Sequence, residues 1–544
     1  MECIEANCFL CTGGLFCRMG KGLGAHDIKG GIRMQSCNQA VRASAKHQDQ
    51  VSVQERCAGV LLHVTSLPEK GGIGTLGETA YQFVDFLKKS GMRIWQMLPV
   101  GPTGFGESPY QSGSTFAGNP LLIDLKTLEK QGLLPEGAFE PLCDSAKVDY
   151  DAVRVQKEML LRKSFAYAYE KVKADVDAYV LSQKDWLPDY ALYAAIKGRF
   201  ENRSWMEWPA EVRHRTEEAM AYYKEELKDE IAYQCYVQYL FDMQWQALRT
   251  YANGKGVKLF GDMPIYVAED SADTWGHPEN FQFDEDLRPT GVAGVPPDYF
   301  SEDGQLWGNP LYAWDDMKKN GYSWWLKRLA AMGDRFDMVR VDHFIGFANY
   351  YCVPFGAPNA RTGEWIIGPG RDFFSKVKKE LPHVNIIAED LGAVNARVRS
   401  LLRFCGYPGM KVLQFAMGGT RNPHAPAQHT ENAIVYTGTH DNNTTLGWWQ
   451  AASEDEQKKA RRMTGTKKDQ DIVGGMIKTA MASVCNTAII PMQDFLRLDG
   501  ESRMNVPGVV GGNWDWRMEK MPEPKLAREL KSMVKEYNRE AGKK

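Results

Sequence analysis

Short runs of apolar and β-branched residues recur along the chain from Gly59 onward, and many end at a polar residue or a proline. Helical spacing of apolar positions lies between most of them, as in 79–90. Strands that alternate with helices are typical of parallel β/α units, and eight units predict a closed (β/α)8 TIM barrel of the α/β class. The eight runs with the length of a strand are 59–63, 93–99, 257–262, 338–342, 385–389, 410–415, 433–437 and 488–492.

Two of the predicted connections are too long for a plain barrel. The first, at about 126–250, is largely helical in its pattern. The second, at about 264–320, is dense in Gly, Pro, Asp and aromatic residues, which predicts loops. Both follow the C-terminal ends of strands, the face where barrel enzymes build their sites. We therefore expect one catalytic barrel with insertions over 56–544.

The charge balance narrows the class of protein. Across 544 residues, 66 Lys and Arg face 69 Asp and Glu, and 43% of residues are hydrophobic. This composition excludes a disordered polyelectrolyte, and the lack of a basic surplus argues against nucleic acid as a partner. No stretch reaches the roughly 20 apolar residues of a membrane span, so no membrane partner is expected. The 15 Trp are a weak hint of a ligand such as a sugar.

The N-terminal segment differs from the rest. Six of the 11 Cys lie in the first 57 residues, with CxxC spacing at Cys8 and Cys11, but no second pair follows to complete a zinc site. From Ala6 to Gln48 there are six basic residues and one acidic residue, which is typical of a plastid transit peptide, although Ser and Thr are scarce. We expect 1–55 to be a disordered targeting segment and the compartment to be the plastid stroma, with the cytoplasm as the alternative.

Three carboxylates lie at or just beyond the ends of predicted strands. Asp342 and Glu389 end the fourth and fifth runs, and Asp441 follows the seventh. Ionised groups beside apolar strands are costly to desolvate unless they are paired or functional. A single strand-end Asp is more often a helix cap or a structural ion pair, so the spacing alone leaves both interpretations open.

The neighbours of two of these carboxylates differ in a way that matters chemically. Arg340 lies two residues before Asp342, so both side chains point to the same side of the strand, and the guanidinium favours an ionised nucleophile. Glu389 follows three apolar residues, which would raise its pKa and hold a proton, as a general acid requires. An ionised nucleophile with a protonated acid fits retaining glycoside chemistry.

At these residues the chain resembles the 4-α-glucanotransferases, also called amylomaltases or disproportionating enzymes. The resemblance runs from about Gly59 to Arg517. Its motifs stand in the family's order: LLHVTSLP from Leu61, WQMLPVGP from Trp95, SPYQS from Ser108, GNPLLID from Gly118, GDMPIYV from Gly261, GVPPDYF from Gly294, QLWGNPLY from Gln305, RVDHF from Arg340, AEDLG from Ala388, GTHDN from Gly438 and RMN from Arg503.

The resemblance implies an α-retaining double displacement between α-1,4-glucans, without a metal or other cofactor. It implies that Asp342 is the nucleophile, Glu389 the acid/base, and Asp441 the carboxylate that holds the sugar's 2- and 3-hydroxyls. It also implies substrate-binding roles for residues that match family motifs, namely Arg340, His440, Tyr110, Asp298, Tyr299, Phe300, Gln305 and Trp307.

Two positions depart from the family's pattern. Phe105 stands where the family commonly has Tyr in an accessory glucan-binding site, which removes a hydroxyl and leaves a stacking face. Ile345 stands where the family often has Arg, which puts one local ion pair in doubt. Neither position belongs to the three carboxylates.

An α-amylase-type hydrolase is the competing interpretation, because it shares the barrel and the carboxylates. A Ca²⁺-loop spacing such as DxDxDG is missing, and too few residues follow the eighth predicted strand for a C-terminal β-sandwich. A catalytically inactive glucan-binding protein is the third class, and retention of all three carboxylates speaks against it. The expected partners are therefore malto-oligosaccharides, amylose and glucose.

Overall fold

The computed structural model describes residues 55–142, 145–297, 301–392, 394–419 and 421–540. The chain divides into two compact units, 1–51 and 52–544, and every described residue belongs to the second. Residues 1–54 of the predicted targeting segment, which include the CxxC pair, therefore lie outside the described residues. No described helix is both long enough and apolar enough to cross a membrane.

Eight parallel strands form the central sheet, in the spatial order β10-β11-β12-β1-β2-β3-β6-β9. Its two ends meet where the Ala388 amide of β9 donates to the Pro408 carbonyl just before β10, at 2.9 Å. The barrel predicted from the apolar runs is confirmed, and each run contains most of one strand. The strands are β1 (Cys57–Leu61), β2 (Ile94–Gln96), β3 (Lys258–Met263), β6 (Met338–Val341), β9 (Ile386–Ala388), β10 (Gly409–Val412), β11 (Ala433–Tyr436) and β12 (Thr487–Pro491).

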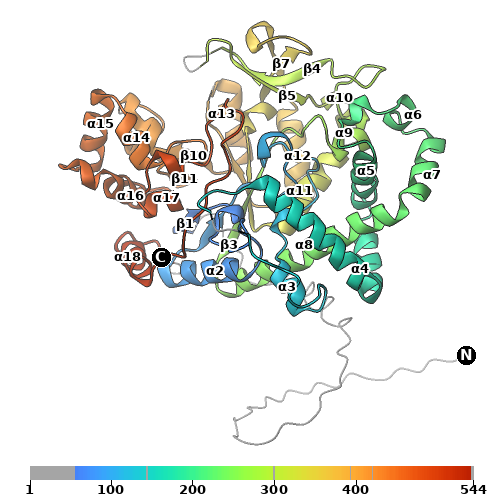
Figure 1. The fold of residues 1–544 in the computed structure, drawn as a ribbon. Helices are drawn as coiled ribbons and strands as arrows, with labels where there is room; N and C mark the ends of the chain where they lie inside the picture. Colours follow the sequence, from blue (N-terminus) through green and yellow to red (C-terminus); the bar gives the residue numbers. More distant parts are fainter. Residues whose placement is uncertain (1–54, 143–144, 298–300, 393, 420, 541–544) are drawn as a thin grey trace, which may run out of the picture. The chain divides into compact units, whose positions relative to one another are not determined.

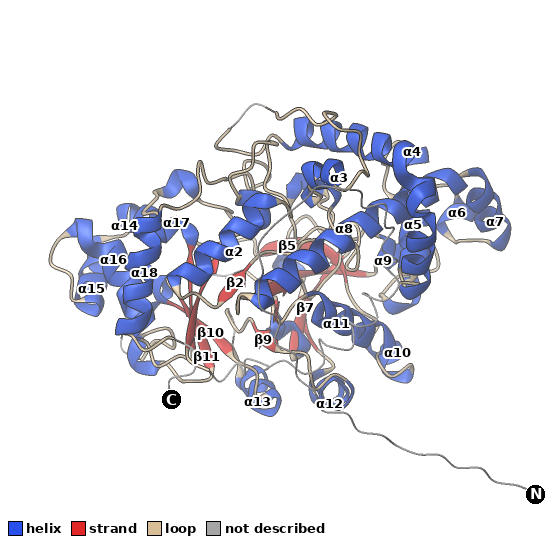
Figure 2. Ribbon diagram, turned by 90° about the horizontal axis from the view of Figure 1, so that it is seen from below, coloured by secondary structure: helices blue, strands red, loops and turns tan. Residues whose placement is uncertain are grey.

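Most strand residues are buried because helices cover the outside of the barrel, as Figure 2 shows for α2, α8 and α11–α13. The helix α18, near the C-terminal end of the described residues, packs on α2. The covering helices are α2 (Glu78–Ser90), α8 (Lys228–Gly254), α11 (Ser323–Arg335), α12 (Gly370–Glu380), α13 (Ala396–Cys405), α14 (Thr445–Ala451), α15 (Glu454–Thr464), α16 (Ile472–Ala482), α17 (Met492–Phe495) and α18 (Pro524–Glu536).

The connection between β2 and β3 is helical, as its pattern predicts. Its helices lie together beside the barrel in Figure 1, in teal and green. The last of them, α8, returns to pack against α2 and β3. The others are α3 (Leu125–Lys130), α4 (Tyr150–Ser182), α5 (Leu187–Arg199), α6 (Ala210–Arg213) and α7 (Glu217–Glu226).

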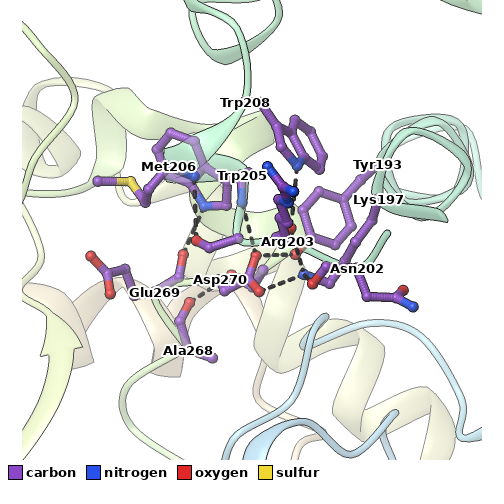
Figure 3. A network of polar contacts seen from close by, with 12 residues as sticks. Tyr193, Lys197, Asn202, Arg203, Trp205, Met206, Trp208, Ala268, Glu269 and Asp270 are labelled. Carbon is purple, nitrogen blue, oxygen red and sulfur yellow. Dashed lines mark hydrogen bonds and ion pairs between the residues drawn. The ribbon is translucent and has the colours of Figure 1, made fainter. Parts of the chain in front are cut away.

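A polar network fastens this helical region to the loop that follows β3 (Figure 3). The Asp270 carboxylate accepts from the Tyr193 hydroxyl at 2.7 Å and from the Lys197 ammonium at 2.5 Å, both on α5. The indole of Trp205 donates to the Glu269 carbonyl at 2.8 Å. Because these contacts hold the start of the connection from β3 to β6, the loop at the C-terminal end of β3 has a fixed course.

The stretch 264–314 contains more regular structure than its composition predicts. It includes α9 (Ala272–Gly276), β4 (Gly291–Val295) and β5 (Gln305–Pro310), and α10 (Trp314–Lys319) begins at its end. β4 and β5 join β7 (Asn349–Pro354) and β8 (Glu364–Ile367) in an antiparallel sheet with the order β5-β4-β7-β8. Figure 1 shows this sheet at one end of the barrel. The prediction of loops was wrong for these strands, because β4 pairs with β5 on one side and, far along the chain, with β7 on the other.

Candidate active site

Arg340 on β6 joins two carboxylates at the end of neighbouring strands. Its guanidinium donates to Asp262 at 2.6 Å and to Asp342 at 2.8 Å. Asp262 and Arg340 are direct neighbours in the β3–β6 register, and Asp342 follows β6. Burial opposes the charge on Arg340, but the two carboxylates outweigh it and hold its pKa well above the ordinary value. The shared orientation of Arg340 and Asp342 that the strand period predicts is thus confirmed.

Asp262 is a member of the site to which the sequence patterns assigned no role. It is 1% exposed, and one carboxylate oxygen accepts from Arg340 and from the Tyr110 hydroxyl, the latter at 2.8 Å. Its Oδ1 has no hydrogen-bond partner among the residues that the structure describes. Burial raises the pKa of Asp262. The signal was available, because Asp262 ends the third apolar run as Asp342 ends the fourth.

Glu389 directly follows β9 and is 7% exposed. Its Oε1 accepts from the Leu391 amide at 3.0 Å. Burial raises the pKa of Glu389 to about 8, and the charge of Asp342 adds to this rise while Arg340 opposes it. Glu389 is therefore mostly protonated at neutral pH, in the direction that its apolar neighbours predict.

Asp441 lies in the loop after β11, and its pKa is shifted in the opposite direction from that of Glu389. Its carboxylate accepts from Asn505 at 2.6 Å and lies 3.2 Å from His440 Nε2. Partial desolvation works against ionisation, but His440 and Asn505 outweigh it and hold the pKa of Asp441 well below its ordinary value. Arg503 donates to the Asp441 carbonyl at 2.6 Å and fixes the backbone of this loop. Asp441 is consequently an ionised group, and its side chain is 43% exposed.

Tyr110 connects the two halves of the site. Its hydroxyl lies 2.9 Å from His440 Nε2 as well as 2.8 Å from Asp262, and the two rings stack with centroids 5.2 Å apart. Burial raises the pKa of Tyr110 well above its ordinary value, so the phenol keeps its proton. A continuous chain of polar contacts results, and it runs in the order Asp342, Arg340, Asp262, Tyr110, His440 and Asp441.

Trp307 on β5 lies against the residue that follows Asp342. Its ring meets that of His343 edge-on at 4.8 Å, and its indole donates to the Gln305 side chain at 3.1 Å. His343 is half-buried, and its partial desolvation lowers its pKa to about 4, so it is neutral at pH 7. The structure therefore brings Trp307 and Gln305 to the site from the second sheet. Trp95, by contrast, is fully buried in β2 and belongs to the core.

Some predicted binding residues cannot be placed in this way. Asp298, Tyr299 and Phe300 lie outside the described residues, in the connection between β4 and β5. Phe105 belongs to a turn of 3-10 helix at Phe105–Glu107, and its side chain is not among those described. Ile345 is 3% exposed and packs in the core.

The titratable groups of the site are mainly carboxyl groups. Among the described residues, no group of three or more His, Cys, Asp or Glu side chains could hold a metal ion. A hollow next to the His440 loop is lined by His63, Asn443 and Arg503, and a second lies behind Tyr110 and Asp262. His440 lines the first hollow and Tyr110 the second.

A (β/α)8 barrel with an ionised and a protonated carboxyl group at the C-terminal ends of its strands fits the chemistry of enzymes that act on glycosidic bonds. Comparison with known families makes this specific. The chain belongs to the 4-alpha-glucanotransferase family, whose model matches residues 62–522.

Individual relatives agree with the family match. The chain is 45% identical to the 4-alpha-glucanotransferase of Streptococcus pneumoniae, over 86% of this chain and 94% of that protein. It is 41% identical to the chloroplastic/amyloplastic 4-alpha-glucanotransferase of Solanum tuberosum, over 85% and 82% of the two chains. The structure of the Streptococcus agalactiae amylomaltase in complex with acarbose is also similar. The match covers 89% of this chain and 100% of that chain, with a TM-score of 0.87 and 39% sequence identity.

Proposed function

We propose that this enzyme transfers α-1,4-glucan segments by a retaining double displacement in which Asp342 is the nucleophile and Glu389 the acid/base. The observation that carries the proposal is the contrast between these two groups. Asp342 accepts a charge-assisted hydrogen bond from Arg340, while Glu389 has a pKa of about 8. A nucleophile must be ionised and a general acid protonated, and the Arg340 contact of Asp342 and the raised pKa of Glu389 support this division of roles.

In the first step, Glu389 would give its proton to the glycosidic O4 while the carboxylate of Asp342 forms a bond to the donor's C1. The leaving glucan departs with the proton, and a glycosyl-enzyme remains. In the second step, Glu389 would take the proton from the 4-OH of an acceptor as that oxygen replaces Asp342 at C1. Two inversions restore the α configuration.

The neighbouring residues have supporting roles in this proposal. Asp441 would hold the 2- and 3-hydroxyls of the donor sugar, and Tyr110 and His440 would form the wall beside it. Trp307 and Gln305 would bind the glucan from the β5 side. We also propose that Asp298, Tyr299 and Phe300 bind the acceptor, and that Phe105 belongs to an accessory glucan-binding site.

The proposed substrates are malto-oligosaccharides, amylose and glucose, in starch or maltodextrin metabolism. The complex of the Streptococcus agalactiae amylomaltase with acarbose supports a glucan as the ligand. For the compartment we propose the plastid stroma, on the acid-poor N-terminal segment and the chloroplastic/amyloplastic name of the Solanum tuberosum relative. Isolation of the protein from plastids and determination of its N-terminal residue test this assignment.

Incubation of the pure enzyme with maltotriose tests the proposed activity. A transferase is expected to form glucose and longer oligosaccharides without a net rise in reducing ends. A rise in reducing ends would favour the α-amylase-type hydrolase instead. Unchanged maltotriose would indicate a binding protein.

Replacement of Asp262 by Asn is expected to lower kcat by about a hundredfold, because Arg340 and Tyr110 both depend on its carboxylate for their orientation. KM should change far less, since Asp262 is only 1% exposed. Steady-state kinetics with maltotriose measure both values. Asp316→Asn, on the exposed face of α10, is the control and should retain wild-type kinetics. An unchanged kcat in Asp262→Asn would remove Asp262 from the proposed mechanism.

A further inference from the structure

Trp514 packs behind the two aromatic side chains that connect the site. Its ring centroid lies 5.8 Å from that of Tyr110 and 6.1 Å from that of His440. It is 7% exposed, so the indole is almost entirely enclosed. The ring is therefore the third member of an aromatic cluster, and the other two members belong to the chain of polar contacts between the catalytic carboxylates.

The backbone of Trp514 is strained. Its φ is +66°, a left-handed conformation that is costly for a bulky residue and persists only where the surroundings impose it. Two contacts impose it here: the Trp514 amide donates to the Met504 carbonyl at 2.8 Å, and the Tyr150 hydroxyl donates to the Trp514 carbonyl at 2.8 Å. The strain thus fixes the direction in which the indole leaves the chain.

The segment that carries Trp514 also holds the loop of Asp441. Arg503 and Asn505, a few residues earlier, bind the Asp441 carbonyl and carboxylate. The Val506 amide donates to the side chain of Asn513, next to Trp514, which closes the intervening turn. One stretch of chain therefore contacts Asp441 by hydrogen bonds and the Tyr110–His440 pair by ring packing.

Burial of a tryptophan in this segment does not by itself require a positive φ. Trp516, two residues along the same segment, is 5% exposed and is not among the described residues with positive φ. It has no ring contact with Tyr110 or His440 among those in the described part of the chain. The strained conformation coincides with the tryptophan that contacts the site.

We infer that Trp514 is a positioning residue for glucan transfer: its strained backbone holds the indole against Tyr110 and His440 and so keeps the Tyr110 hydroxyl between Asp262 and His440. The inference rests on the proposed function, in which these side chains surround the donor sugar. Small displacements of groups around a reacting centre slow the chemical step strongly. Binding of a long donor depends on many other contacts, so loss of the ring should affect kcat far more than KM.

The test compares Trp514 and Trp516 variants in the full chain, with maltoheptaose as the substrate. Trp514→Ala is expected to lower kcat by about thirtyfold and to change KM by less than about threefold. Trp514→Phe should restore kcat to within about fivefold of the wild type, because a flat ring again packs against Tyr110 and His440. Trp516→Ala and Trp516→Phe are the matched controls, and neither should lower kcat by more than about threefold.

Trp514→Gly separates the strain from the ring. Glycine adopts positive φ freely, so this variant should unfold at a higher temperature than Trp514→Ala while its kcat remains as low. The inference is overturned if Trp514→Ala and Trp516→Ala lose kcat equally, or if Trp514→Ala raises KM and leaves kcat intact. A wild-type enzyme that does not disproportionate maltoheptaose would contradict the proposed function itself, and this outcome is independent of any variant.

Discussion

Replacing Asp342 by Asn is expected to reduce kcat for maltotriose disproportionation by at least about ten-thousandfold. The amide has no ionised oxygen to form a bond to C1, although its carbonyl can still accept the hydrogen bond that Arg340 now donates to Asp342. The fold should therefore survive the substitution. Product analysis by chromatography measures the activity, and thermal unfolding shows that the protein is folded.

A matched control for this substitution lies at the other end of the same strand. Asp337 precedes β6 and is also paired with an arginine, Arg249, at 3.2 Å. Asp337→Asn should lower the unfolding temperature but keep kcat within about threefold of the wild type, because it lies at the opposite end of the barrel from the site.

Labelling distinguishes the nucleophile from a residue that only supports it. A fluorine-substituted glucosyl donor that slows the second step should accumulate a glycosyl-enzyme, with the label on the peptide that contains Asp342. A label on the peptide of Asp441, or substantial turnover by Asp342→Asn, would contradict the assignment of the nucleophile.

The barrel could be predicted because its strands are buried on both faces and therefore stand out as apolar runs. The residues at which the strands end were predicted less accurately. Asp342 and Glu389 were assigned to strands, whereas β6 ends at Val341 and β9 at Ala388. Both residues are the first after their strands, and their amides still donate to the neighbouring strand, Asp342 to the Met263 carbonyl at 2.9 Å and Glu389 to the Val341 carbonyl at 3.1 Å.

The second sheet escaped prediction for a physical reason. β4 has the sequence Gly-Val-Ala-Gly-Val, whose glycines are needed for close strand packing but read as loop signals. A Cβ at Gly294 would lie 2.5 Å from the Gln305 carbonyl oxygen of β5. The β4–β5 pair is local and was hidden by these glycines, whereas the pairing with β7 is long-range and leaves no trace in the local pattern.

The polar chain through the site could be predicted only in part. The two-residue spacing of Arg340 and Asp342 was enough to place them together. The contacts of Asp262 with Tyr110, and of Tyr110 with His440, join three different parts of the sequence, so only the resemblance to a family pointed to Tyr110 and His440. The positive φ of Trp514 depends on contacts with Met504 and Tyr150 and leaves no pattern in the sequence.

The pKa of Glu389 predicts the alkaline limit of the activity. The first chemical step needs its protonated form, and the raised pKa of about 8 keeps that form in the majority up to about this pH. We expect kcat/KM for maltotriose to be nearly constant from about pH 6 to 7.5 and then to fall about tenfold for each unit above 8. A profile that instead falls above about pH 5, near the ordinary pKa of a glutamate, would contradict the role of burial.

Replacement of Glu389 by Gln should lower kcat for maltotriose about a thousandfold and abolish the alkaline limit, because the amide is neutral at every pH but gives no proton. Release of fluoride from α-glucosyl fluoride should fall only about tenfold, since fluoride leaves with little protonation. Glu364→Gln, an exposed glutamate on β8, is the control for both assays. Equal losses with both donors would indicate that Glu389 acts in binding and not as the acid.

The same substitution has a consequence for stability whose sign follows from the pKa. The folded protein keeps a proton on Glu389 up to about pH 8, whereas the unfolded chain releases it near about pH 4.5, so unfolding releases a proton in this window and the free energy of unfolding falls as the pH rises through it. Glu389→Gln lacks this term. The unfolding temperature of Glu389→Gln, relative to that of the wild type, should therefore rise between pH 5 and pH 8, as measured by calorimetry. A difference that stays constant over this range would show that Glu389 is already ionised in the folded enzyme and cannot be the general acid.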